Sequence, residues 1–259
     1  MKNNLLVRGS PVGIIKGILF DKDGTLSNSE DHLIKIASYR IRQVISLLKK
    51  EKIHPQKLSK VEKLLKITYG LTPKGLKPDG SIAVASREQN LITTSTICCL
   101  IGESWPNALA LAQEAFENAD HFYDKNNANH PSSPILNGFL EFQQRVINKG
   151  IICALISNDN NNGIENFLNK NNLKAEISHY WSCDNKPIKP NPNAAKGLCK
   201  ILDLNPEECA LIGDADSDLI MAKKAGISLA IGYTGGWRTP PKLNYYDHLI
   251  QHWDEISIE

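Results

Sequence analysis

Residues 14–26 read IIKGILFDKDGTL, and this stretch decides the fold. Its first seven residues form an apolar run that is too short for a helix and rich in β-branched side chains. We therefore expect a buried strand over 14–20, preceded by a short irregular lead-in over 1–13. The run stops abruptly at Asp21, so the polar residues that follow begin a loop at the carboxyl end of this strand.

The second half of the chain alternates between strands and helices. Apolar strands are expected over 151–156, 177–181, 209–212 and 229–231. Helices are expected between them at about 136–149, 163–171, 192–202 and 217–225. Strands that alternate with helices form parallel βαβ units, whose strands are buried on both faces. The expected fold class is therefore α/β, with a doubly wound parallel-sheet, Rossmann-like core.

A block with helical periodicity separates the first strand from this alternation. Helices are expected at about 30–48, 58–69, 82–101 and 105–124. The segment 70–80 has too much Gly and Pro for a helix interior, and the polar segment 125–134 is typical of a linker. We expect an inserted all-helical cap domain over 28–134 and a core domain made of 1–27 and 135–259.

Composition excludes several classes of function. The chain has 259 residues, 41% hydrophobic and 22% charged, with a formal net charge of +2. This balance is typical of a globular protein and does not favour a charge-driven nucleic-acid binder. No apolar run approaches the roughly 20 residues that cross a bilayer, and the six cysteines form no C-x-x-C pair. We expect a cytoplasmic protein that binds neither nucleic acid nor membranes, and the sequence leaves the oligomeric state open.

Polar side chains follow three of the expected strands, and a lysine opens a later helix. In open α/β sheets, ligands bind beyond the carboxyl ends of the strands, so residues more than 100 positions apart should meet there. Carboxylates, a hydroxyl, an amide and a lysine at one sheet edge suit Mg²⁺ and a phosphate group. The residues are Asp21, Asp23, Ser157, Asn158, Lys189, Asp214 and Asp218.

Four motifs in this order resemble those of the haloacid dehalogenase superfamily of aspartate-nucleophile phosphatases. The segment Phe20–Leu26 resembles the first motif, and Ser157-Asn158 the second. Lys189-Pro190 resembles the third, and Gly213–Asp218 the fourth. A helical insertion between the first two motifs is similar to family members with an α-helical cap, including phosphoglycolate phosphatases and β-phosphoglucomutases.

The resemblance implies roles for the four carboxylates. Asp21 is the expected nucleophile, and Asp23 the general acid and base. The implied Mg²⁺ ligands are the Asp21 side chain, the backbone carbonyl of Asp23 and Asp214, with Asp218 behind them. The four carboxylates of Asp21, Asp23, Asp214 and Asp218 carry a formal charge of −4. Mg²⁺ and Lys189 return +3, so this interpretation requires the metal.

The remaining implied contacts are with the phosphate group. Ser157, Asn158 and the backbone amides around Gly24 are expected to hold the phosphoryl oxygens. Lys189 is expected to neutralise the charge that develops on them. Lys186 also precedes a proline and is the nearest competitor for this role.

These expectations amount to a Mg²⁺-dependent phosphatase. The substrate is a small phosphorylated metabolite, phosphoglycolate-like or a sugar phosphate, and the reaction passes through an aspartyl phosphate. A phosphomutase of the β-phosphoglucomutase type shares all four motifs. A phosphoacceptor signalling module uses similar residues, although the D-x-D pair and the inserted helices argue against it.

Several residues keep two interpretations. Lys74, Lys77 and Arg87 either close over an anionic substrate or belong to a solvated connector. Trp237 either lines the rim of the site or packs in the edge of the domain. Asp214 and Asp216 precede an expected helix, and each also suits its N-cap.

Overall fold

The computed structural model describes residues 3–127 and 133–259. The chain divides into two compact units. Met1–Ser29 and Ser133–Glu259 form the first, called here the α/β unit. Glu30–Ser132 form the second, called the helical unit. Residues 128–132 of the expected linker lie outside the described residues.

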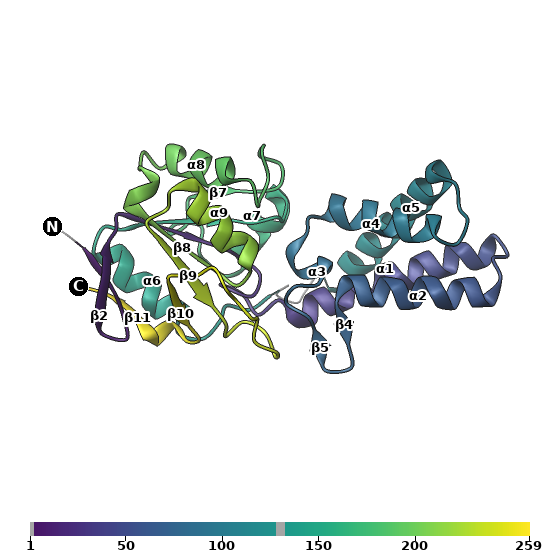
Figure 1. Cartoon of the computed structure of the whole chain (residues 1–259), viewed down its shortest axis with the longest axis horizontal. Coiled ribbons are helices and arrows are strands. Elements are labelled where there is room, and N and C mark those ends of the chain that lie inside the picture. Colours follow the sequence, from purple (N-terminus) through teal and green to yellow (C-terminus); the bar gives the residue numbers. More distant parts are fainter. Residues whose placement is uncertain (1–2, 128–132) are drawn as a thin grey trace. The chain divides into compact units, whose positions relative to one another are not determined.

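A six-stranded sheet organises the α/β unit (Figure 1). Its strand order is β10-β9-β8-β3-β6-β7, and every neighbouring pair is parallel. The strands are β3 (Gly17–Phe20), β6 (Ile152–Ile156), β7 (His179–Trp181), β8 (Cys209–Gly213), β9 (Leu229–Tyr233) and β10 (His248–Ile250). The α/β fold class is confirmed, and β10 is a strand that the sequence pattern did not reveal.

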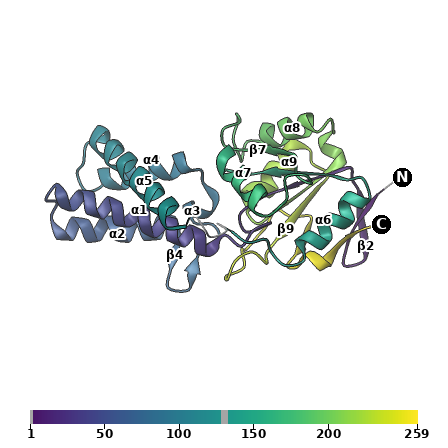
Figure 2. The same cartoon turned by 180° about the vertical axis from the view of Figure 1, so that it is seen from behind.

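The central strand β3 is buried on both faces because its side chains alternate between two apolar clusters. Ile18 and Phe20 belong to one cluster, and Leu19 belongs to the other. Helices α6 (Phe139–Asn148) and α7 (Asn161–Lys170) supply the first cluster. Helices α8 (Pro192–Ile201) and α9 (Asp216–Ala225) supply the second. Figures 1 and 2 show these two pairs on opposite faces of the sheet, which is the doubly wound arrangement.

The described part of the expected irregular lead-in, residues 3–13, forms strands, so that expectation was wrong. An antiparallel sheet with the order β11-β1-β2 joins both ends of the described chain. Its strands are β1 (Asn4–Val7), β2 (Ser10–Ile14) and β11 (Ile256–Ile258). Leu5 and Val7 are buried because they face the main core. The expected strand over 14–20 is therefore divided: Ile14 ends β2, and β3 starts at Gly17.

The helical unit is inserted after the loop that follows β3. Asn28 N–H donates to Pro134 O at 2.9 Å, and Leu136 N–H donates to Leu26 O at 2.9 Å. The two chain segments that border the insertion are thus paired within the α/β unit. This pairing delays α6 to Phe139, three residues after the expected start, and Gly138 precedes the helix with a φ of 83°.

Residues 30–127, the described part of the helical unit, form five helices and one small hairpin. The helices are α1 (Glu30–Lys50), α2 (Pro55–Tyr69), α3 (Ser81–Val84), α4 (Arg87–Cys99) and α5 (Trp105–Asn127). The expected helix over 82–101 is divided because Ala85 is extended and Ser86 caps α4 through a reciprocal bond with Gln89. The Gly- and Pro-rich segment after α2 folds into strands β4 (Leu71–Thr72) and β5 (Gly75–Leu76).

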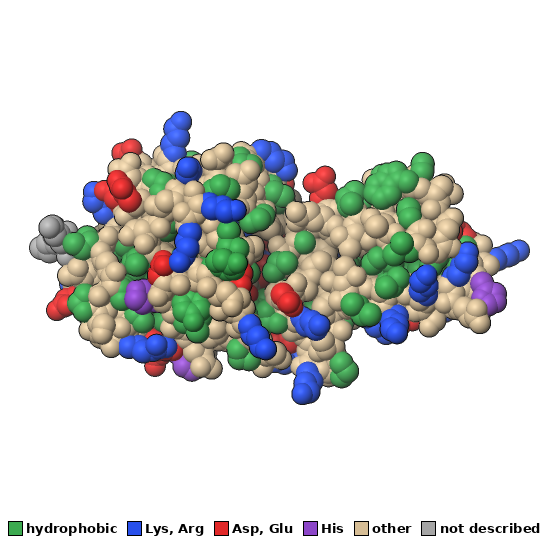
Figure 3. All heavy atoms as spheres, in the orientation of Figure 1, with side chains coloured by type: hydrophobic (Ala, Val, Ile, Leu, Met, Phe, Trp, Pro, Cys, Tyr) green, Lys and Arg blue, Asp and Glu red, His purple; other side chains and the backbone are tan. Residues whose placement is uncertain are grey.

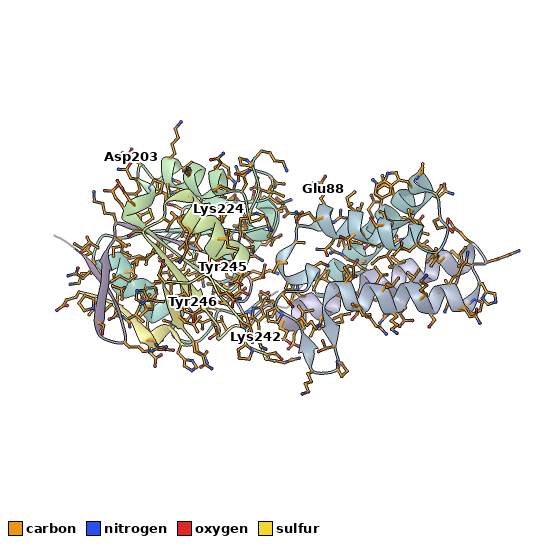
Figure 4. The ribbon with its side chains drawn as sticks, viewed as in Figure 1. Glu88, Asp203, Lys224, Lys242, Tyr245 and Tyr246 are labelled. Carbon is orange, nitrogen blue, oxygen red and sulfur yellow. The ribbon has the colours of Figure 1, made fainter. Side chains whose placement is uncertain are left out.

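Local sequence signals set where helices of the α/β unit end. Helix α9 ends at Gly226, whose φ of 83° lets its N–H bond Ala222 O and Lys223 O. Lys224 lies in the last turn of α9, where the helix dipole favours a cation (Figure 4). Two short 3₁₀ helices, η1 (Pro206–Glu208) and η2 (Trp253–Glu255), precede β8 and β11.

Charged side chains are scattered over the face shown in Figure 3, where basic residues lie among acidic and apolar ones. This distribution agrees with a net charge of only +2. Within the described ranges, no helix combines the length and the apolar character that crossing a membrane requires.

Candidate active site

The sheet order brings the ends of three motif-bearing strands together. Strand β3 lies between β6 and β8, so the loops that follow them are neighbours. Asp21 comes directly after β3, and its N–H donates to Ile212 O of β8 at 2.9 Å. Ser157 follows β6, and its N–H donates to Trp181 O of β7 at 2.9 Å. The convergence expected from the sequence pattern is present in the structure.

Lys189 is the buried cation of this sheet edge. Its Nζ lies 2.5 Å from Asp21 Oδ1 and 2.8 Å from Asp218 Oδ1, and it donates to Ile156 O at 3.2 Å. Burial acts to lower the pKa of Lys189, but the two carboxylates outweigh it and the pKa is raised. Lys186, the competitor, is exposed and bonds only the backbone oxygen of Cys183 among its described contacts.

Three carboxylates gather around this lysine. Asp21, Asp214 and Asp218 are all buried, and each offers an oxygen within 4.8 Å of the others. Burial raises the pKa of Asp21 to about 6, although Lys189 opposes the shift. Burial and the charges of Asp21 and Asp218 raise the pKa of Asp214 well above its ordinary value. The ammonium group of Lys189 therefore neutralises only part of the negative charge of these three carboxylates.

The donor set fits a hard divalent cation. Mg²⁺ prefers oxygen ligands and takes a small number of carboxylates, and its two charges would complete the compensation. The sequence reasoning placed Asp218 behind the metal ligands. In the structure, its carboxylate also offers an oxygen within 4.8 Å of those of Asp21 and Asp214.

Asp214 is held at both oxygens. Thr25 Oγ1 donates to its Oδ1 at 3.1 Å, and Trp237 Nε1 donates to its Oδ2 at 2.5 Å. Trp237 is buried, so of its two interpretations the structure supports contact with the site rather than packing alone. Asp216 is not the N-cap of α9, because Ala215 holds that position and the Asp216 carboxylate bonds Asn244.

Asp23 is held by a second buried lysine. Lys22 Nζ lies 3.0 Å from Asp23 Oδ2 and 2.9 Å from Asp159 Oδ2. Ser29 Oγ donates to Asp23 Oδ1, and its own oxygen lies 2.6 Å from Ser27 Oγ. The Asp23 side chain is thus tied to Lys22 and Ser29, and its charge contributes to the raised pKa of Asp21.

The residues expected to hold phosphate differ in how far their hydrogen-bonding groups are already engaged within the protein. The Ser157 hydroxyl accepts from Asp159 N–H at 3.1 Å and keeps its own proton for donation. Asn158 is half-buried beside it. The Gly24 N–H donates to Ser27 O at 3.0 Å, so the expected contact around Gly24 has to come from a neighbouring amide. Gly24 itself has a φ of 81° and lies against Trp237 and Asp214, where a Cβ would collide with both.

A family comparison agrees with this geometry. The family model of haloacid dehalogenase-like hydrolases matches residues 15–226, a range that holds every residue of the cluster.

The chain belongs to the haloacid dehalogenase-like hydrolases.

Relatives of this haloacid dehalogenase-like hydrolase include curated phosphatases. Phosphoglycolate phosphatase 1 of Pseudomonas aeruginosa is 26% identical over 133 residues, covering 50% of this chain and 45% of that protein. The chain therefore matches only about half the length of its curated relatives.

Solved structures share the fold over nearly the whole chain. A predicted phosphoglycolate phosphatase from Haemophilus somnus superposes with a TM-score of 0.60 at 20% identity, covering 91% of this chain and 93% of its own. A β-phosphoglucomutase from Clostridium difficile gives a TM-score of 0.58 at 19% identity, covering 93% and 92%. At these identities the likeness concerns the fold.

Sequence reasoning missed four of the contacts in this hydrolase. Thr25 lies inside the D-x-D-G-T-L string, and Asp159 follows directly after Ser157-Asn158, so both stood next to recognised motifs. Lys22 and Ser29 gave no signal in the sequence. A lysine between two aspartates is typical of a solvated loop.

In the helical unit, Lys74 and Lys77 are exposed, and Arg87 pairs with Asp120 at 2.8 Å.

The raised pKa of Asp21 predicts a pH-dependent cost to stability. Between its ordinary pKa of 3.8 and about 6, the folded chain binds more protons at Asp21 than the unfolded chain does. Stability from this group is therefore lost as the pH rises through that range. In EDTA, Asp21→Asn should raise the free energy of unfolding at pH 7.5 by about 3 kcal/mol, at about 1.4 kcal/mol per pKa unit.

Denaturant unfolding of both proteins from pH 4 to 8 measures this difference. We expect it to shrink steadily as the pH falls toward 4, where Asp21 is protonated in the folded chain and the unfolded chain approaches its ordinary pKa of 3.8. A difference that stays constant over this range would show that Asp21 does not titrate within it.

Proposed function

We propose that this hydrolase is a Mg²⁺-dependent phosphatase that removes the phosphate from a small metabolite, phosphoglycolate or a sugar phosphate. The observation that carries the proposal is the buried contact of Lys189 with Asp21 and Asp218 at the sheet edge, with Asp214 beside them. The curated relatives named phosphoglycolate phosphatase support the reaction class.

Asp21 is the proposed nucleophile. One of its carboxylate oxygens attacks the phosphorus atom, and the bond from phosphorus to the substrate oxygen breaks as the aspartyl phosphate forms. Lys189 already touches Asp21, so its charge is in place to offset the negative charge of the arriving phosphate. Ser157 can donate its free proton to a phosphoryl oxygen.

Asp23 is the proposed acid and base. It gives a proton to the departing substrate oxygen, and it then takes a proton from the water that attacks the aspartyl phosphate. This second step restores the Asp21 carboxylate and releases inorganic phosphate. The contacts from Lys22 and Ser29 fix the direction in which the Asp23 carboxyl group points.

Asp21, Asp214 and Asp218 would hold the Mg²⁺, together with the backbone carbonyl of Asp23. The bound ion supplies positive charge that lets an anionic nucleophile approach an anionic substrate. We also propose that residues 28–134 act as the cap domain of a catalytic core formed by 1–27 and 135–259. The boundaries of the helical unit support this division.

Hydrolysis of p-nitrophenyl phosphate tests the reaction class. We expect turnover in Mg²⁺, and a loss of about a hundredfold or more in excess EDTA, because a metal contributes several kcal/mol of charge stabilisation. Activity should return when Mg²⁺ is added back. Equal rates in EDTA and in Mg²⁺ would reject the metal requirement.

Two further assays separate the alternatives. Conversion of one sugar phosphate isomer to another without net phosphate release would favour a phosphomutase. Labelling by acetyl phosphate that stops at one phosphoryl group per chain would favour a signalling module. Release of inorganic phosphate from a panel of phosphorylated metabolites would identify the substrate.

A further inference from the structure

We propose that Trp237 is a positioning residue that orients the Asp214 carboxylate for the divalent cation. The inference rests on the proposed function, because it assumes that Asp214 is a metal ligand. It assigns a task to a side chain that lies outside the four motifs that identify the site.

The contact itself is short and buried. Trp237 Nε1 lies 2.5 Å from Asp214 Oδ2, and the indole side chain is buried. Thr25 Oγ1 donates to the other carboxylate oxygen at 3.1 Å. With one donor on each oxygen, rotation of the Asp214 carboxylate would break a hydrogen bond within a buried site. Each oxygen keeps a lone pair that can face a metal.

The backbone is shaped to bring the indole to this position. A Cβ on Gly24 would collide with Trp237 Nε1, and a Cβ on Gly236 would collide with the Gly24 backbone. Glycine at both positions lets the loop after β9 pack directly on the loop after β3. This close approach carries Trp237 from the end of β9 to the carboxylate that follows β8.

The two other buried tryptophans make different contacts. Trp181 Nε1 donates to a backbone oxygen, Pro187 O, at 3.0 Å. Among the described residues, buried Trp253 Nε1 has no hydrogen-bond partner, and its ring packs among Phe20, Phe142 and Tyr233. Apolar packing alone therefore does not need an indole N–H in this core. At Trp237 the N–H is aimed at a charged group of the site.

Residues that orient a metal ligand through a hydrogen bond typically change metal affinity by about 10- to 100-fold when they are removed. We expect Trp237→Phe to raise the Mg²⁺ dissociation constant by this factor. Once Mg²⁺ saturates the variant, kcat should return to within about threefold of the original protein, because Trp237 does not touch the substrate in this proposal.

Isothermal titration of the full chain with MgCl₂, in the absence of substrate, measures the dissociation constant directly. Trp253→Phe is the matched control, since it truncates a buried tryptophan of the same unit whose N–H bonds no residue that the structure describes. We expect Mg²⁺ to bind the control as it binds the original protein. Replacing Trp237 by benzothienylalanine, which keeps the ring shape and lacks the N–H, tests the bond itself even where Trp237→Phe does not fold.

Failure of the proposed function and failure of the inference about Trp237 give different results in this experiment. If the original protein does not bind Mg²⁺, the proposed function fails at its metal site. If it binds Mg²⁺ and the Trp237 variants bind equally well, the inference about Trp237 is rejected while the proposed function stands. Equal weakening in Trp237→Phe and Trp253→Phe would also reject it, because the effect would then reflect general loss of packing.

Discussion

Asp21→Asn should lower the rate of phosphate release by at least about three orders of magnitude. The amide nitrogen carries its lone pair in resonance and the amide oxygen is uncharged, so the side chain cannot displace the leaving group. The neighbouring geometry should survive, because asparagine has the same shape. The measurement is kcat for p-nitrophenyl phosphate in saturating Mg²⁺.

Asp216→Asn is the control for this change. Asp216 lies near the same sheet edge, but its carboxylate bonds Asn244 and takes no part in the cluster. We expect it to retain full activity. Acid quenching of the original protein during turnover should also reveal one phosphoryl group bound to Asp21 by mass spectrometry. An active Asp21→Asn protein would reject the assignment of the nucleophile.

Lys189→Met is expected to lower kcat by about 10²- to 10³-fold, the usual effect of losing one group that stabilises charge in the transition state. It should also destabilise the fold. The ammonium contacts Asp21 and Asp218, and removing one partner of a buried ion pair costs about 3–5 kcal/mol. Methionine fills most of the volume of the lysine stem, so the charge is the main difference.

Lys186→Met is the control that shows whether the losses in kcat and stability are specific to Lys189 or follow from replacing any lysine in this segment. Both lysines precede a proline, and only Lys189 is buried in the cluster. We expect Lys186→Met to match the original protein in kcat and in the midpoint of urea unfolding. If the two lysine variants lost the same activity, the assignment of Lys189 to the site would be wrong.

Much of the α/β unit could be predicted from the sequence because its strands are short, apolar and followed by polar residues. The run over 151–156 matches β6 (Ile152–Ile156), and the run over 209–212 matches β8 (Cys209–Gly213). The local apolar pattern was enough to predict these two strands, since a strand buried on both faces is apolar along its length.

The antiparallel sheet could not be predicted in the same way. Strand β1 pairs with β11, whose residues lie about 250 positions later in the chain. Neither segment is apolar enough to stand out, because each shows only part of its surface to the core. The hairpin of β4 and β5 was missed for a related reason, since two-residue strands carry no periodicity.

In the site, the motifs predicted which side chains converge but not how they are held. Asp21, Lys189 and Asp214 were expected to meet, and they do. Lys22, which holds Asp23, comes from a position without a signal of its own, and Trp237, which holds Asp214, kept two interpretations. Hydrogen bonds between distant loops depend on backbone approach, which the sequence does not display.

The paired segments at the insertion point have a consequence for engineering. Asn28 bonds Pro134, and Leu136 bonds Leu26, so the chain leaves and re-enters the α/β unit at one place. The two ends of the insertion are thus tied to each other within the α/β unit. A short splice across this point, or a transplanted insertion of another length, would leave the register of every sheet strand unchanged.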